Sequence, residues 1–241
     1  MKYYLFLILG ILFFSCNQNK EPVKENLLTY NELVKAKRYR SFPEALQEKD
    51  SVYKLLLINK DLEEIPEEID ELINLNTLEL SMNNLSNLPK QIGKLQNIQS
   101  LYISNNKFEK IPGVVFTLKN LKRLNLSDNP LKKLSGDFEN LDKLEELALR
   151  RIGLTNIDPI FQLKNLKILV LSQNKIENLS KDIGKLENLE ILDLSNNQLN
   201  HLPDEIMKLK KLKKLDLTSN KFNQQYIDQL RKQLPNTTIR H

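Results

Sequence analysis

The stretch Leu189–Lys211 reads LEILDLSNNQLNHLPDEIMKLKK and is the most regular copy of a unit that fills most of the chain. If its residues are numbered as places one to 23, apolar side chains occupy places one, four, six, eleven, fourteen, eighteen and twenty-one, and an Asn occupies place nine. Leu192 and Leu194 have the two-residue period of a β-strand, whereas Ile206 and Leu209 have the spacing of one helical turn. A strand followed by a turn and a short return cannot bury its apolar edge alone. The unit therefore predicts neighbours of the same kind on both sides.

Eight copies of the unit follow one another. They begin at Val52, Leu75, Ile98, Leu121, Leu144, Leu166, Leu189 and Leu212, 23 residues apart except that the fifth copy is one residue shorter. Over residues 52–223 the pattern LxxLxLxxNxLxxLPxxIxxLxx resembles the leucine-rich repeat proteins of the longer LPxxI class. The resemblance implies an α/β solenoid, a curved horseshoe with a parallel β-sheet on its concave face and short helices or turns on its convex face. Helical caps are expected at residues 26–51 and 224–241, because the open apolar ends of the array must be covered.

The Asn at place nine is expected to be structural. Its amide can satisfy backbone groups of adjacent turns, which need partners when they are buried. Six copies have this residue, at Asn83, Asn106, Asn129, Asn174, Asn197 and Asn220. Lys60 replaces it in the first copy, at the end of the array, where water can take over the missing bonds. Ile152 replaces it in the short fifth copy, and this coincidence predicts an irregular stack there.

Residues 1–16, MKYYLFLILGILFFSC, resemble the signal peptide and lipobox of bacterial lipoproteins. The apolar run is shorter than the about 20 residues that span a bilayer, and it suits a secretory signal over residues 1–15. Ser15 and Cys16 conform to the lipobox, whereas Phe13 stands where Leu is usual. The resemblance implies cleavage before Cys16 and fatty acylation of this residue, with two or three acyl chains as a stable anchor. An ordinary signal peptide or a short anchor that happens to contain a Cys is the alternative.

Residues 16–25 are polar, lack apolar periodicity and are interpreted as the lipidated Cys and a flexible tether. The sequence thus predicts an exported protein, anchored through Cys16 to a membrane of a bacterial cell envelope. The outer membrane is expected, and the leaflet is left open.

The residue inventory argues against an enzyme, a cofactor and a metal site. Cys16 is the only cysteine, so disulfides within the chain and Cys-rich metal sites are excluded. His201 and His241 have no ligand partners at a useful spacing, and no phosphate-binding glycine loop or nucleophile elbow is present. The net charge is +5, with Lys interspersed with Glu, which favours a solvated surface over a nucleic-acid site. A monomer is expected.

The functional surface is expected on the concave face, at places two, three, five, seven and eight. An apolar group with a polar rim is typical of interaction sites, and aromatic and Arg residues are favoured anchors. Arg150 stands at place seven, where six copies have Ser or Thr, and Arg151 follows it. The predicted site for a protein or peptide partner comprises Tyr102, Arg123, Ala148, Arg150, Arg151, Ile168, Val170, Ile191, Asp193 and Asp216.

Other interpretations stay open. The apolar residues of the site can reflect strand propensity alone. Asp193 and Asp216 share place five in adjacent strands, so their carboxylates, about 5 Å apart, can bind a cation or a basic side chain, or be merely solvated. The alternative to a binding module is a structural cell-envelope protein without a concave-face ligand. It predicts a high copy number and indifference to substitutions on the concave face.

Overall fold

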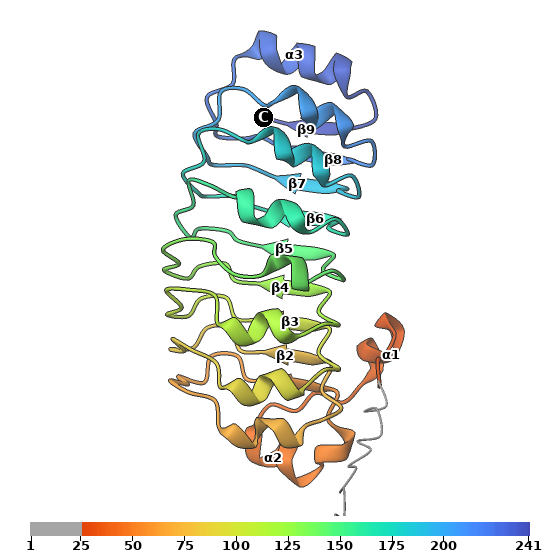
Figure 1. Ribbon diagram of the computed structural model, residues 1–241, viewed down its shortest axis with the longest axis vertical. Helices are drawn as coiled ribbons and strands as arrows, with labels where there is room; N and C mark the ends of the chain where they lie inside the picture. Colours follow the sequence, from red (N-terminus) through yellow and green to blue (C-terminus); the bar gives the residue numbers. More distant parts are fainter. Residues whose placement is uncertain (1–25) are drawn as a thin grey trace, which may run out of the picture.

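The computed structural model describes residues 26–241, which form one parallel sheet with a return behind each repeat (Figure 1). The strands follow each other in chain order across the sheet. They are β1 (Lys54–Leu56), β2 (Thr77–Glu79), β3 (Ser100–Tyr102), β4 (Arg123–Asn125), β5 (Glu146–Ala148), β6 (Ile168–Val170), β7 (Ile191–Asp193), β8 (Lys214–Asp216) and β9 (Thr238–Arg240). The predicted solenoid is confirmed, since every repeat contributes one strand. The expected signal sequence, Cys16 and the tether lie outside the described residues.

The apolar places of the unit form the core between the sheet and the returns. Place four, the middle residue of each strand from β1 to β8, is a buried Leu in every repeat. Places three and five flank it on the opposite, concave face and are partly exposed, except that Ser100 is buried and Lys214 is exposed. This alternation is the two-residue period of a strand, and it places the residues of the predicted site on the outer face of the sheet.

The returns of the first seven repeats each contain a short 3-10 helix rather than an α-helix. These are η2 (Glu67–Glu71), η3 (Lys90–Lys94), η4 (Gly113–Thr117), η5 (Phe138–Asn140), η6 (Asp158–Gln162), η7 (Lys181–Lys185) and η8 (Asp204–Lys208). A proline directly precedes four of them, with φ between −57° and −67°. The proline ring holds φ near this value and offers no N–H, so it suits an extended step before a helix. The prolines are Pro66, Pro89, Pro112 and Pro203.

Every repeat leaves its strand through a residue in the left-handed conformation at place eight. The φ angles run from 51° at Arg151 to 62° at Met82. The eight residues are Asn59, Met82, Asn105, Asp128, Arg151, Gln173, Asn196 and Ser219. Residues other than Gly adopt this conformation at a cost, and Asn and Asp tolerate it best. The stacked repeats therefore impose the turn, whichever side chain stands there.

The place-nine Asn residues bind backbone groups, as predicted. The Nδ2 of Asn174 donates to three carbonyl oxygens at 2.8–3.3 Å, and its Oδ1 accepts from two amides at 3.0 and 3.2 Å. The partners are the carbonyls of Leu149, Leu171 and Ser172 and the amides of Ile152 and Leu154. Both the same and the preceding repeat are contacted, so the Asn row joins the repeats along the array.

The stack is regular at Ile152, and the predicted irregularity there is wrong. Strand β5 keeps its register with both neighbours, and Ile152 is buried, with its N–H donating to the Asn174 side chain. The fifth repeat is one residue shorter because its return, not its strand or turn, lacks a residue. Helix η6 begins directly after Ile157, whereas one residue separates Leu202 from η8.

The fourth return departs most from the others. Its helix η5 has three residues, and Gly136, with φ +135°, lies just before it. The ring of Phe116 from the third repeat packs against this glycine, where a Cβ would be 2.2 Å from two ring atoms. The same ring meets Phe138 edge to face, with centroids 5.3 Å apart. Gly136 thus permits both the turn and the contact between two returns.

The two ends of the array are covered by different means. At the C-terminal end, α3 (Gln224–Gln233) buries Ile227 and Leu230, and β9 pairs with β8. At the N-terminal end, Tyr39 forms a bridge to Leu55, and η1 (Lys49–Ser51) follows α2 (Phe42–Gln47), which buries Ala45. Helix α1 (Tyr30–Lys35) lies apart from this cover, beside the sheet at the level of β2 and β3 (Figure 1). None of the helices within the described part of the chain is long and apolar enough to cross a membrane.

Candidate functional site

Four residues of the predicted site form one apolar patch on β5, β6 and β7. Ala148 lies opposite Val170, and Ile168 lies opposite Ile191, in parallel register. All four are partly exposed. Because adjacent strands are about 4.8 Å apart, the four side chains share one surface. We name these four residues the apolar patch.

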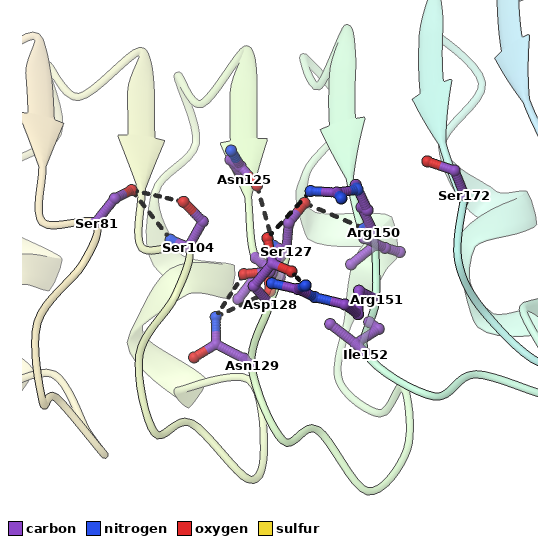
Figure 2. Close-up of polar contacts among 12 residues, drawn as sticks. Ser81, Ser104, Asn125, Ser127, Asp128, Asn129, Arg150, Arg151, Ile152 and Ser172 are labelled. Carbon is purple, nitrogen blue, oxygen red and sulfur yellow. Dashed lines mark hydrogen bonds and ion pairs between the residues drawn. The ribbon is translucent and has the colours of Figure 1, made fainter.

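Arg150 and Arg151 follow β5 and share the carboxylate of Asp128 (Figure 2). Arg150 Nη1 is 3.7 Å from Asp128 Oδ2, and Arg151 Nε donates to Asp128 Oδ1. The Asp128 side chain is 16% exposed, whereas those of Arg150 and Arg151 are 42% and 63% exposed. Two guanidinium groups on one carboxylate leave a net positive charge that faces solvent next to the apolar patch.

Arg150 interrupts a row of hydroxyl side chains at place seven. In the regular part of the row, Ser104 donates from its N–H and its Oγ to Ser81 Oγ, at 3.2 and 2.8 Å. The N–H of Arg150 donates to Ser127 Oγ at 3.1 Å in the same way (Figure 2). The backbone of Arg150 therefore keeps the regular geometry, and only its side chain differs from the row.

Asp193 and Asp216 lie opposite each other in register, and each closes the turn after its own strand. Asp193 Oδ1 accepts from the N–H and Oγ of Ser195 at 3.0 and 2.7 Å. Asp216 Oδ1 accepts from the N–H and Oγ1 of Thr218 at 3.0 and 2.6 Å, and Arg240 lies 3.5 Å from its other oxygen. One carboxylate oxygen of each is thus engaged in local turn bonds, and Asp216 has a cationic neighbour.

Tyr102 and Arg123 lie apart from the apolar patch. Strand β4 separates Tyr102 from Ala148 in the register. Burial raises the pKa of the Tyr102 hydroxyl above its ordinary value. Arg123 Nε donates to Glu146 Oε1 at 3.0 Å, and the guanidinium lies 5.8 Å from the ring centroid of Tyr30 in α1. The structure therefore does not gather all the predicted residues into one cluster.

Sequence reasoning missed the contacts of an element that lies beside the sheet at the level of the first repeats. Residues 26–35, here named the arm, contact the starts of the first strands and end in α1. Ser100 is only 3% exposed, whereas its counterparts at place three are partly or fully exposed. The expectation that residues 26–51 as a whole close the end of the array is wrong for α1. The apolar patch lies beyond Arg123, the farthest strand residue with which the arm has a described contact.

The concave face combines apolar side chains with charged ones. In the span from residue 26 to the C-terminus, no three His, Cys, Asp or Glu side chains gather as a metal site requires. Burial raises the pKa of the Glu79 carboxyl, while a hydrogen bond from Ser81 opposes this shift. On the described surface, the apolar patch lies next to the solvent-facing guanidinium groups of Arg150 and Arg151.

Two family models match the chain, one described as a leucine-rich repeat region over residues 55–157 and one as a leucine rich repeat over residues 164–222. Among solved structures, a leucine-rich repeat protein of Leptospira interrogans is 35% identical, with 84% of this chain and 57% of that one covered and a TM-score of 0.68. A chain of the TLR13–ssRNA13 complex is 31% identical, with coverages of 77% and 27% and a TM-score of 0.66. A chain of the octameric complex of latrophilin 3, Unc5D and FLRT2 is 28% identical, with coverages of 77% and 59% and a TM-score of 0.64.

This chain thus spans less than two thirds of the length of each of these three proteins. A search of curated proteins gives no match.

Proposed function

Because the chain belongs to the leucine-rich repeat proteins, we propose that it is a non-enzymatic binding protein that presents its concave face to a protein or peptide partner. The observation that carries the proposal is the apolar patch on β5–β7, bordered by Arg150 and Arg151. Apolar contact area next to an Arg anchor is typical of protein interfaces. Among the similar structures, FLRT2 contributes its leucine-rich repeats to a complex with two other proteins.

The concave face favours a protein over a nucleic acid. Nucleic acids are held chiefly by unpaired cations that contact phosphates. Here Lys167 pairs with Glu145 and Lys213 with Glu190, at 3.0 and 2.6 Å. Asp193 also stands beside the apolar patch, opposite Val170, and would repel a phosphate. The partner surface that fits is an apolar side chain flanked by an acidic group facing Arg150 and Arg151.

We expect Ile168→Asp to reduce partner binding at least tenfold, because it places an unpaired charge in a desolvated contact, at a cost of more than about 1.4 kcal/mol. The measurement is the yield of a crosslinked adduct from a photoreactive residue at Val170, in cells of the source organism. Arg150→Ala tests the cationic border in the same assay. Lys181→Asp, on an exposed residue of η7, is the matched control and is expected to leave the adduct unchanged.

An adduct that survives Ile168→Asp and Arg150→Ala equally well would show that the site is elsewhere. A high copy number with no adduct from this face would instead support the structural cell-envelope role.

We also propose that the protein is exported and held at a bacterial cell-envelope membrane by acylation of Cys16. The support is the resemblance of residues 1–16 to a lipoprotein signal and the polar tether that follows. Acyl chains contribute about 0.8 kcal/mol per buried CH₂, so two or three chains anchor stably. The outer membrane is the proposed location.

We expect metabolic labelling with a fatty-acid analogue to mark the wild-type protein and to fail in Cys16→Ala, which should also leave the membrane fraction. Ser15→Ala is the control, because it keeps a small residue before the cleavage point and should retain the label. Separation of the two envelope membranes by density then tests the location. Label that persists in Cys16→Ala would contradict the anchor and leave the concave-face proposal untouched.

A further inference from the structure

The arm is bound through its main chain by three amide side chains of the second and third repeats. The N–H of Asn26 donates to Asn97 Oδ1 at 2.9 Å, and its carbonyl accepts from Asn76 Nδ2 at 3.0 Å. The N–H of Leu28 donates to Asn76 Oδ1 at 3.0 Å, and its carbonyl accepts from Gln99 Nε2 at 2.7 Å. Two alternate residues of the arm thus have both backbone groups satisfied, as in a β-ladder. We name Asn76, Asn97 and Gln99 the amide groove.

The repeats hold the groove in place. Asn97 Nδ2 donates to the Ile73 carbonyl at 2.9 Å, Asn76 Nδ2 to the Asn74 carbonyl at 2.8 Å, and Gln99 Nε2 to Asn76 Oδ1 at 2.7 Å. The three groove residues are at most 3% exposed. This burial includes the docked arm, whose main-chain donors and acceptors supply the hydrogen-bond partners that buried amides need.

The groove is confined to the early repeats. At place two, which holds Asn76 and Gln99, the fourth to seventh repeats have charged residues. These are Lys122, Glu145, Lys167 and Glu190. Charged side chains pair with each other along this edge, as Lys167 does with Glu145, and do not offer the paired donor and acceptor of an amide.

Outside the groove, Asn26 Nδ2 donates to Asn74 Oδ1 and to the Tyr53 hydroxyl at 3.1 and 3.3 Å, and α1 adds few contacts. Leu33 is the one buried residue of α1, while Tyr30 is 68% and Val34 52% exposed. Lys54 Nζ donates to the Leu33 carbonyl at 2.7 Å, and Arg123 lies over the Tyr30 ring. A helix of six residues is too short to be stable alone, so the arm is ordered only while it is docked.

We propose that the amide groove is a binding site for the main chain of an extended peptide, with the arm as its resident ligand, and that the arm leaves reversibly to admit a peptide segment of the protein partner. The identity of the competitor rests on the proposed function, whereas the release of the arm does not. Release frees the side chains of Lys54 and Arg123, which contact the docked arm. The open part of the concave face would then extend from the apolar patch toward β1.

Hydrogen exchange of the full-length protein, measured by NMR, tests the release. We expect the amides of Asn26 and Leu28 to exchange more slowly than in a free peptide and faster than the core amide of Leu101. Gln99→Ala removes one bond to Leu28 and a support of Asn76, so exchange at Leu28 should rise roughly fivefold. Lys167→Ala, at the same place in the sixth repeat, should change nothing there.

Exchange of Asn26 and Leu28 at the rate of Leu101 would mean that the arm is a permanent part of the fold, and exchange at the free rate would mean that it is not docked. Either result overturns the proposal. No partner is needed for this measurement, so its failure is distinct from a failure of the concave-face function.

Competition in trans tests the peptide specificity. A synthetic peptide with the sequence of residues 26–35 is added to the isotope-labelled full-length protein at several mM, because a tethered arm has an effective concentration of about 1 mM or more. The peptide should speed exchange of the protein's own Asn26 and Leu28 amides at least twofold. The same peptide methylated on the nitrogen of Leu28 lacks the donor to Asn76 and should have no effect. Equal effects, or none from either peptide, would refute main-chain recognition by the groove.

Discussion

Replacement of Gly136 by Ala is expected to destabilise the protein by roughly 3–5 kcal/mol, the sum of backbone strain and steric overlap. At φ +135° any residue other than Gly is strained, and the new Cβ would lie 2.2 Å from two atoms of the Phe116 ring. The ring has little room to yield, because it is buried and packs edge to face on Phe138. The overlap is therefore transmitted to the contact between the third and fourth returns.

Urea unfolding of three glycine variants separates the two causes. Gly153→Ala places a Cβ in open space at φ +79° and tests strain alone, at about 1–2 kcal/mol. Gly113→Ala has neither a close atom nor a positive φ, and its midpoint should stay near that of the wild type. If Gly136→Ala unfolds at the same urea concentration as Gly113→Ala, the described packing of the fourth return is incorrect.

Asn174→Ala is expected to cost about 3–5 kcal/mol, because it strips hydrogen bonds from several buried backbone groups at once. Three carbonyls lose a donor, and the amides of Ile152 and Leu154 lose their acceptor. In a regular repeat the place-six carbonyl, such as that of Leu80, accepts from its own Asn and from the Asn of the next repeat. Ile152 cannot donate in this way, so the Leu149 carbonyl depends on Asn174. Arg151 directly precedes Ile152, and the loss should therefore also disturb the cationic border of the apolar patch.

The matched control is Asn220→Ala, at the end of the Asn row. Asn220 makes the same kind of bonds, but it is partly exposed, so water can replace them and the cost should be about 1 kcal/mol. Thermal unfolding followed by circular dichroism gives the comparison. An equal loss of unfolding free energy in both variants would show that burial does not determine how much each Asn of the row contributes to stability.

The fold could be predicted because the same places recur at a fixed interval. In-register stacking turns equal places of successive repeats into neighbours, so Ala148 and Val170 could be placed side by side from the sequence. The same rule explains why Tyr102 lies apart, since one strand intervenes. The shared carboxylate of Asp128 could not be foreseen, because it depends on how two Arg side chains turn after leaving the sheet.

The docking of the arm could not be predicted from the repeat pattern. The arm itself has no periodicity, and the amide side chains that it contacts are residue types that also occur on a solvated edge of a sheet. The sequence shows Asn76, Asn97 and Gln99 but not that residues 26–28 pass over them. The position of the irregular return was missed for a related reason. The departure from Asn at place nine predicts irregularity at Ile152, whereas Ile152 fits the regular turn and Gly136 marks the changed return.

At place eight, the conformation of the backbone is independent of the type of side chain. One backbone turn recurs in eight repeats, yet six residue types occupy it: Asn, Met, Asp, Arg, Gln and Ser. Since neighbouring repeats impose the turn, a new side chain there changes what is displayed without changing how the chain is folded. The side chains at place eight can therefore vary along one edge of the sheet while the backbone of the array stays the same. The surface that a partner meets can change by substitution at these positions without a change of fold.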